Sequence, residues 1–239
     1  AGKAAGVQVS KNSSGMGGSA KVSIRGVRSV AGDNQPLYVI DGVPMLNSTS
    51  EQAYSAIGGT ANAGNRDGGD GISNLNPEDV ESISILKGAP AAALYGSQAA
   101  NGVILITTKK GNTVGRRDIH FSTGLTFEKA FSLPEMQNSY GVSDVTDSWG
   151  EKENLTVYDN LGDFFRTGLT SITSVSVNSG NDKLQTYFSY ANTTGRGILN
   201  ENKLSKHNIN LRETAVLFNS RLKLDGNVNV MKQTVKNKP

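Results

Sequence analysis

The chain of 239 residues carries 28 glycines, no cysteine, 6% aromatic residues, 19% charged residues and a net charge of only +3. The small net charge gives no basic footprint for nucleic acid, and the lack of cysteine excludes disulfides, thiol catalysis and cysteine metal sites. The glycine content lies well above the usual ~7% and favours turn-rich β-structure over a helical bundle.

Neither a membrane helix nor a secretory signal is predicted. The longest apolar run, residues 103–106, falls far short of the ~18 residues that a membrane helix needs. Residues 1–6 lack the apolar core of a signal peptide. We therefore expect either a cytosolic protein or one whose original N-terminus has been removed, and the motifs below favour removal.

Residues 1–115 predict a compact α+β unit. A first short helix is expected after Asn76, an N-cap residue followed by Pro77, and a second from Pro90 to a glycine cap at Gly96. Strands are expected in the short apolar runs, at residues 22–25, 37–40, 83–86 and 103–106.

Residues 116–239 follow a different pattern, in which apolar and polar residues alternate as in strands with one apolar and one wet face. Five such strands are expected, around residues 119–127, 174–177, 183–190, 208–212 and 221–230. Alternation of this kind fits a soluble β-sandwich as well as a membrane barrel.

The connections favour the barrel. They are expected to be long (about 129–170), short (179–183), intermediate (193–204) and short again (214–219), and membrane barrels combine tight periplasmic turns with longer outer loops. Five strands are too few for a membrane barrel, which starts at about eight. The remaining strands of such a barrel are therefore expected outside this chain.

Five blocks of the first half resemble one family. They are SIRG at 23–26, QPLYVIDGVP at 35–44, NPEDVESI at 76–83, LKGAPAAALYGS at 86–97 and ANGVILITTKKG at 100–111. In this order they resemble the plug domain of TonB-dependent outer-membrane receptors of the SusC/RagA-like branch. The second half is more loosely similar to the start of that family's barrel.

The resemblance implies an α+β plug domain, a small mixed sheet with short helices, followed by antiparallel strands of a transmembrane β-barrel of the plugged, roughly 22-strand kind. It implies a location in the bacterial outer membrane and TonB-driven import of a large nutrient, an oligosaccharide or a peptide. The implied partners are a SusD-like surface lipoprotein, outer-membrane lipid, and the TonB complex through an N-terminal segment that we expect to be absent here. Phe121, Phe127, Phe188, Leu222 and Leu224 would face lipid, and the polar face would line the lumen.

The topology of the family places two polar connections, residues 28–34 and 45–71, at the outward tip of the plug. We therefore predict substrate contacts from seven of their residues: Arg28, Asp33, Asn34, Asn47, Arg66, Asp67 and Asp70.

No catalytic site and no cofactor are predicted. Asp67 and Asp70 make calcium conceivable, but the EF-hand ligand spacing is missing. His120 and His207 stand apart from any cluster of carboxylates. Asp41 is expected to accept backbone N–H groups in a turn, and the glycines to serve turns that need a positive φ.

The alternative function is that of a soluble or secreted carbohydrate-binding β-protein without transport activity. Such a protein would present exposed aromatic platforms, and Trp149, in the long connection, is the only tryptophan.

Overall fold

The computed structural model describes residues 4–11, 16–27, 34–45, 47, 70–135, 137–142, 144, 146, 149–153, 158–218 and 221–236. These residues form a two-stranded sheet, β1-β2, a four-stranded sheet, β4-β3-β6-β5, and a five-stranded sheet, β11-β10-β9-β8-β7. We call the first two sheets with their helices the plug unit, after the resemblance, and the five-stranded sheet the wall sheet.

The plug unit is a small mixed α+β fold, as predicted. In β4-β3-β6-β5, β3 runs parallel to β6, whereas β4 and β5 are antiparallel to their neighbours. Its elements are β1 (Val7–Lys11), β2 (Ala20–Ile24), β3 (Leu37–Ile40), β4 (Val43–Met45), η1 (Ile72–Asn74), η2 (Pro77–Asp79), β5 (Val80–Leu86), α1 (Ala89–Tyr95), η3 (Gly96–Ala99) and β6 (Val103–Thr108).

The two predicted helix starts are confirmed. Asn76 caps η2 by accepting a hydrogen bond from Glu78 N at 3.2 Å, with Pro77 in the first helical position. This helix lasts one 3-10 turn, because β5 begins at Val80. Helix α1 begins at Ala89, with Pro90 in its first turn, and ends at Tyr95; its cap is Gly96, whose φ of 70° suits glycine.

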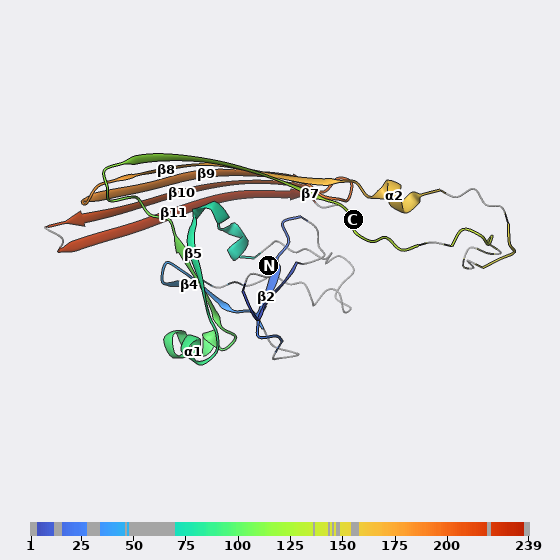
Figure 1. The fold of residues 1–239 in the computed structure, drawn as a ribbon, viewed down its shortest axis with the longest axis horizontal. Helices are drawn as coiled ribbons and strands as arrows, with labels where there is room; N and C mark the ends of the chain where they lie inside the picture. The colour runs from blue at the N-terminus through green and yellow to red at the C-terminus, as the bar shows by residue number, and fades with distance from the viewer. Residues whose placement is uncertain are drawn as a thin grey trace.

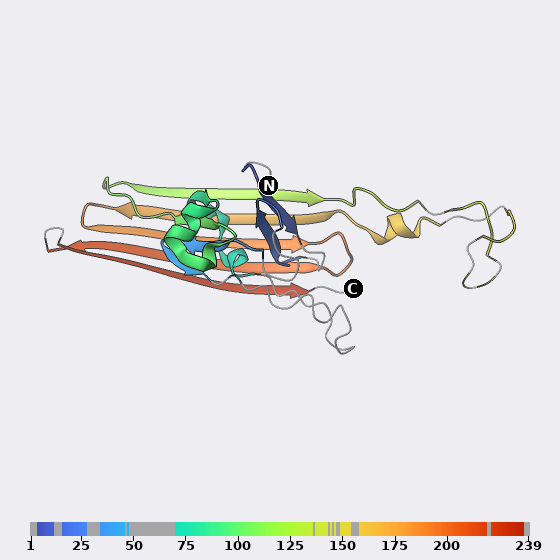
Figure 2. The same ribbon diagram turned by 90° about the horizontal axis from the view of Figure 1, so that it is seen from below.

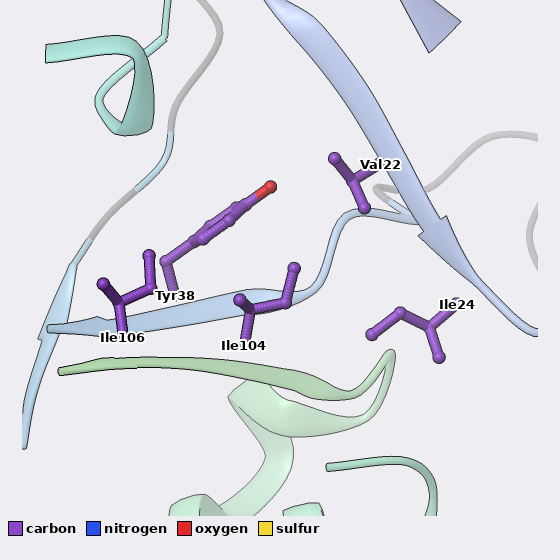
Figure 3. Close-up of a cluster of buried hydrophobic side chains, with 5 residues drawn as sticks. All are labelled: Val22, Ile24, Tyr38, Ile104 and Ile106. Atoms are coloured by element: carbon purple, nitrogen blue, oxygen red, sulfur yellow. The ribbon is translucent and has the colours of Figure 1, made fainter. Parts of the chain in front are cut away.

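Two apolar clusters cover the two faces of the central strands β3 and β6. Figure 3 shows the first cluster, in which Val22 and Ile24 of β2 pack against Tyr38, Ile104 and Ile106. On the opposite face, Val39 and Val103 pack against Ala91 of α1 and Ala99 of η3. The alternation of strand side chains thus gives the plug unit its own core.

Gly102 shows why the turn before β6 requires glycine. Its φ is 98°, and a Cβ at this position would lie 2.9 Å from Ile24 Cδ1 and 3.0 Å from the carbonyl oxygen of Leu86. Any larger residue would be strained and would push β2 and β5 away from this turn.

The wall sheet is a single layer of long antiparallel strands in chain order. Each strand has 12 to 15 residues, enough for the 9–11 or so that a tilted strand needs to cross a bilayer. The strands are β7 (Arg117–Glu128), β8 (Gly168–Gly180), β9 (Leu184–Arg196), β10 (Lys203–Leu217) and β11 (Leu222–Lys236).

Figures 1 and 2 show the plug unit against one face of this layer, and no second sheet covers the other face among the described residues. The uncovered face is the apolar one, whereas the core of a sandwich lies between the apolar faces of two stacked sheets, so these strands do not form the sandwich of the alternative.

The four connections of the wall sheet follow the predicted order of long, short, intermediate and short, but each is shorter than predicted, and the third spans 197–202 instead of 193–204. Residues 181–183 make a tight turn at one end, called the turn end, where Arg221 N also donates to the Phe218 carbonyl oxygen at 3.2 Å. The connections 129–167 and 197–202 are at the other end, called the loop end. The long connection carries α2 (Asn160–Phe164), which is capped by Asp159 and lies past the end of the sheet in Figure 1. No helix in the described part of the chain is long and apolar enough to cross a membrane.

The two faces of the wall sheet differ in chemistry. The face turned away from the plug unit, called the outer face, is apolar in two complete rows of the ladder. These rows are Ile119, Val177, Phe188, Leu211, Val228 and Phe121, Val175, Tyr190, Ile209, Val230. All five side chains predicted to face lipid lie on this face.

The apolar band of the outer face runs obliquely across the strands. On β7 it continues toward the loop end with Leu125 and Phe127, whereas on β11 it continues toward the turn end with Leu222 and Leu224. An oblique band is expected where strands tilt by about 35–45° against a flat apolar layer.

Candidate functional site: the plug–wall interface

The inner face of the wall sheet is polar where it meets the plug unit. On β9 and β10 its buried side chains with polar groups are Tyr187, Ser189, Asn208, Asn210, Arg212 and Thr214. Strand alternation places all six on the side opposite the apolar band. Burying so many polar groups is favourable only where partners meet them.

Arg212 is the centre of this interface. Its side chain is only 5% exposed and lies between Asp41 of the plug unit, 2.9 Å away, and Asp225 of β11. Asp225 is held in a fork, with Arg212 Nε and Nη2 each donating to one carboxylate oxygen at 2.9 Å. This bidentate geometry is the strongest form of an arginine–carboxylate pair.

Asp41 joins the plug unit to this network. It follows β3 with a φ of 49°, and its two carboxylate oxygens accept hydrogen bonds from Thr108 N at 3.0 Å and Thr108 Oγ1 at 2.5 Å. Arg212 Nη1 also donates to Thr108 Oγ1 at 2.6 Å. Asp41 thus accepts a backbone N–H as predicted, although from the end of β6 and not from its own turn.

An open pocket of about 350 Å³ adjoins this network. Lys110 lines it, with its ammonium group 3.9 Å from Asp225. The remaining lining residues are Val39, Asp41, Gly42, Tyr95, Leu105, Ile106, Thr107, Arg212 and Asp225. The pocket therefore lies where the last residues of β3 and β6 meet the wall sheet.

A second polar contact joins η2 to β9. The Tyr187 hydroxyl donates to Asp79 Oδ1 at 3.0 Å, and both side chains are almost fully buried. Asp79 Oδ2 and Ser189 Oγ find no hydrogen-bond partner among the described residues. The contact thus retains hydrogen-bonding capacity that water can satisfy.

Nearer the loop end, the wall sheet holds the backbone of the plug unit. Asn208 Nδ2 donates to the carbonyl oxygen of Asn74 at 2.9 Å, and Lys206 Nζ donates to that of Ser73. Carbonyl groups at the end of η1 are thereby paired with wall side chains.

Gly195 of β9 and Gly197 of the connection after it leave room for the side chain of Met16, which lies between β1 and β2. A Cβ on Gly195 would lie 2.3 Å from Met16 Cε, and a Cβ on Gly197 would lie 3.3 Å from Met16 Cγ. A larger residue at position 195 would displace Met16, so the fit depends on glycine.

The structure describes three of the seven predicted substrate-contact residues, and each is engaged within the plug unit. Asn34 is buried, and Asn47 Oδ1 accepts from Ile72 N at 3.1 Å. Asp70 accepts from Ala20 N at 3.1 Å and Ser73 N at 2.9 Å, which ties β2 to η1. A role of these residues in binding substrate stays a prediction.

Arg28, Asp33, Arg66 and Asp67 lie outside the described residues, so their predicted role stays a prediction too. Calcium at Asp67 and Asp70 is likewise untested, and no group of three potential metal ligands occurs in the described part of the chain. His120 lies on the inner face of β7, and His207 lies on the outer face, 2.9 Å from the Tyr190 hydroxyl.

Sequence reasoning missed the Arg212 network. Arg212 stands in an ordinary alternating strand, and Asp41 and Arg212 are 171 residues apart. The sequence did offer one signal: Arg212 alternates onto the same strand face as Asn208 and Asn210. If that face is buried, a charged residue on it requires a partner of opposite charge.

Comparison with known proteins agrees with this architecture. Residues 1–103 match the model of the TonB-dependent Receptor Plug Domain family. The chain is 32% identical over 244 residues to the TonB-dependent receptor SusC of Bacteroides thetaiotaomicron. This alignment covers 96% of the present chain and 22% of SusC.

Two solved structures share the fold. A structure of the RagAB peptide importer in its closed-closed state aligns with a TM-score of 0.72 at 23% identity, over 98% of this chain and 28% of that chain. The siderophore receptor PirA from Acinetobacter baumannii aligns with a TM-score of 0.55 at 19% identity, over 96% of this chain and 28% of that chain.

The chain thus spans about a quarter of the length of these proteins. Three observations indicate the same family. Residues 1–103 match a plug-domain model, SusC aligns along nearly the whole chain, and the plug unit is docked on long antiparallel strands. The chain belongs to the TonB-dependent receptors, in their SusC/RagA-like branch.

Proposed function

We propose that the receptor to which this chain belongs imports a large nutrient, a glycan or a peptide, across the outer membrane with energy supplied through TonB. The plug unit gates the lumen, and a SusD-like lipoprotein works with the receptor on the outer side. The proposal rests on family membership and on the polar character of the plug–wall interface. One structural neighbour is the RagAB peptide importer, which supports a peptide, and the glycan is proposed from the resemblance alone.

The observation that carries the proposal is the polar nature of the described contacts that hold the plug unit against the wall sheet. The plug unit has two apolar clusters of its own, whereas the described contacts of Asp41, Asp79 and Asn74 with the wall sheet are ion pairs and hydrogen bonds. Polar contacts can be exchanged for contacts with water, so they cost less to separate than an apolar core of the same area. Such an interface suits a domain that must move away from the wall during transport.

The orientation in the membrane follows from the connections. Tight turns of membrane barrels face the periplasm and long loops face outward. The turn end of the wall sheet is therefore assigned to the periplasm and the loop end to the outside. The proposed substrate contacts are the seven residues predicted from the family's topology: Arg28, Asp33, Asn34, Asn47, Arg66, Asp67 and Asp70.

A reversible crosslink between plug and wall tests the gating role. The chain has no cysteine, and Asn208 Nδ2 lies 2.9 Å from the main-chain carbonyl oxygen of Asn74, so Asn74→Cys with Asn208→Cys places one thiol on each side of this contact, and disulfide formation is verified on a gel before uptake is measured. In cells that express the full receptor, we expect oxidation to stop TonB-dependent uptake of the nutrient and a reductant to restore it.

Each single cysteine variant, treated with the same oxidant, is the matched control and should keep its uptake. Uptake should also require an intact TonB and the proton gradient. Full uptake through a receptor whose crosslink is demonstrated on a gel would show that this contact does not open during transport, and uptake without TonB would refute the energy source.

A further inference from the structure

Three cations lie side by side at the loop end of the outer face. Lys203 of β10 is paired in the ladder with Arg196 of β9 on one side and with Lys236 of β11 on the other. All three side chains are exposed and alternate onto the face that carries the apolar band. Lys232, paired with His207, lies on the same face four residues nearer the middle of β11.

This arrangement is unfavourable for the isolated protein. Side chains directly opposite each other in a sheet have Cβ atoms about 4.5–5.5 Å apart, and like charges in such pairs destabilise the sheet. Only Lys236 has a carboxylate partner in the described chain, Glu201 at 2.9 Å, while Arg196 and Lys203 have none. Three cations and one carboxylate leave a local excess of positive charge.

The rest of the same ladder row is apolar. Arg196 is paired with Leu169 of β8, which is paired with Phe127 of β7. Because the apolar band is oblique, β7 and β8 are still apolar at this row, whereas β9 to β11 are already cationic. The row therefore offers an apolar surface directly beside a cationic one.

We propose that this row binds a phosphorylated lipid of the outer leaflet, with a phosphate at Arg196, Lys203 and Lys236 and an acyl chain against Phe127 and Leu169. Arginine and lysine form strong charge-assisted hydrogen bonds to phosphate oxygens, and arginine does so through two parallel donors. The phosphate neutralises the three cations. The lipid as a whole has a charged part for the cationic side of the row and an acyl chain for its apolar side. The proposal rests on the outer-membrane orientation assigned above.

The repulsion among the three cations predicts the direction in which the Tm of each variant should change. In lipid-free dodecyl maltoside, Lys203→Gln removes the central cation and should raise the Tm of the purified full receptor. With diphosphoryl lipid A added as the probe, the Tm of the wild type should rise in a saturable way, and most of that rise should be lost in Lys203→Gln. Lys183→Gln, the same change in a turn at the opposite end, should keep the wild-type response.

Two further additions separate the sources of phosphate. Lipid A without its phosphates and inorganic phosphate alone should both leave the Tm of the wild type unchanged. An equal rise with inorganic phosphate would overturn the lipid in favour of a soluble anion, and an equal rise with dephosphorylated lipid A would overturn the role of the cations. The proposal also fails if Lys203→Gln and Lys183→Gln respond alike.

This experiment is independent of transport. A receptor that imports through TonB but shows no lipid A response would refute the lipid site alone. A receptor that shows the lipid A response but imports nothing would refute the proposed function alone.

Discussion

The interior of the plug unit and its contact with the wall sheet are held together by different forces. The interior packs Val22, Ile24, Tyr38, Ile104 and Ile106 in an apolar cluster. The described contacts to the wall sheet include the Asp41–Arg212 ion pair and buried hydrogen bonds. The comparison indicates that the fold of the plug unit and its docking can be weakened separately.

The largest effect is expected from the docking network. Arg212→Met leaves Asp41 and Asp225 without their shared cation, and loss of one member of a buried ion pair costs about 3–5 kcal/mol. We expect hydrogen exchange at 41–45 and 106–110 of the full receptor to accelerate, while exchange in β2 stays slow. The triple variant Asp41→Asn, Arg212→Met and Asp225→Asn should recover most of the protection. Equal acceleration in β2 would show that docking and folding of the plug unit are one event.

A core substitution should give the complementary result. Ile104→Ala removes a buried branched side chain, and such changes cost about 2–5 kcal/mol. We expect faster exchange throughout β2, β3 and β6, measured on the full receptor. Ile104→Val is the matched control, with an expected cost of about 0.5–1.5 kcal/mol. A variant Ile104→Ala with unchanged exchange in β2 would contradict the cluster as the source of plug stability.

The smallest effect concerns Tyr38 at high pH. Burial, and secondly the charge of Asp70, raise the pKa of Tyr38 to about 12 from 10.0. The folded plug unit favours the neutral phenol, so this contribution to stability is present below pH 10 and is lost as the pH rises toward 12. In an absorbance titration, Tyr38→Phe should remove one tyrosine that ionises near pH 12. Loss of a tyrosine that ionises near pH 10 would mean that Tyr38 is not buried in solution.

Much of the fold could be predicted from local patterns. Alternation or a capping residue was enough to predict many elements. These are the strand at 37–40, the helix after Asn76, the helix before Gly96 and all five wall strands. Strands β1 and β4 were missed, since VQVSK and VPM are too short for a clear period. The predicted strands of the wall were also too short at their ends, where polar residues such as Thr193 and Thr194 continue the ladder.

The candidate site was less predictable. The polar connections at 28–34 and 45–71 were selected by their place in the family's topology. In the structure Asn47 and Asp70 accept hydrogen bonds from η1 and β2, and their contact with substrate stays a prediction. Their short side chains make equally good hydrogen bonds to backbone and to substrate, so composition does not separate the two roles.

The sequence by itself determined the family, the mixed α+β unit and a sheet with one apolar and one polar face, because these depend on residues close together in the chain. Only the tertiary structure decided which polar residues meet. Asp41 and Arg212, or Asp79 and Tyr187, come together through the register of the strands and the placement of the plug unit. The same register sets Arg196, Lys203 and Lys236 in one row, since pairing across strands is a property of the sheet and not of any one strand.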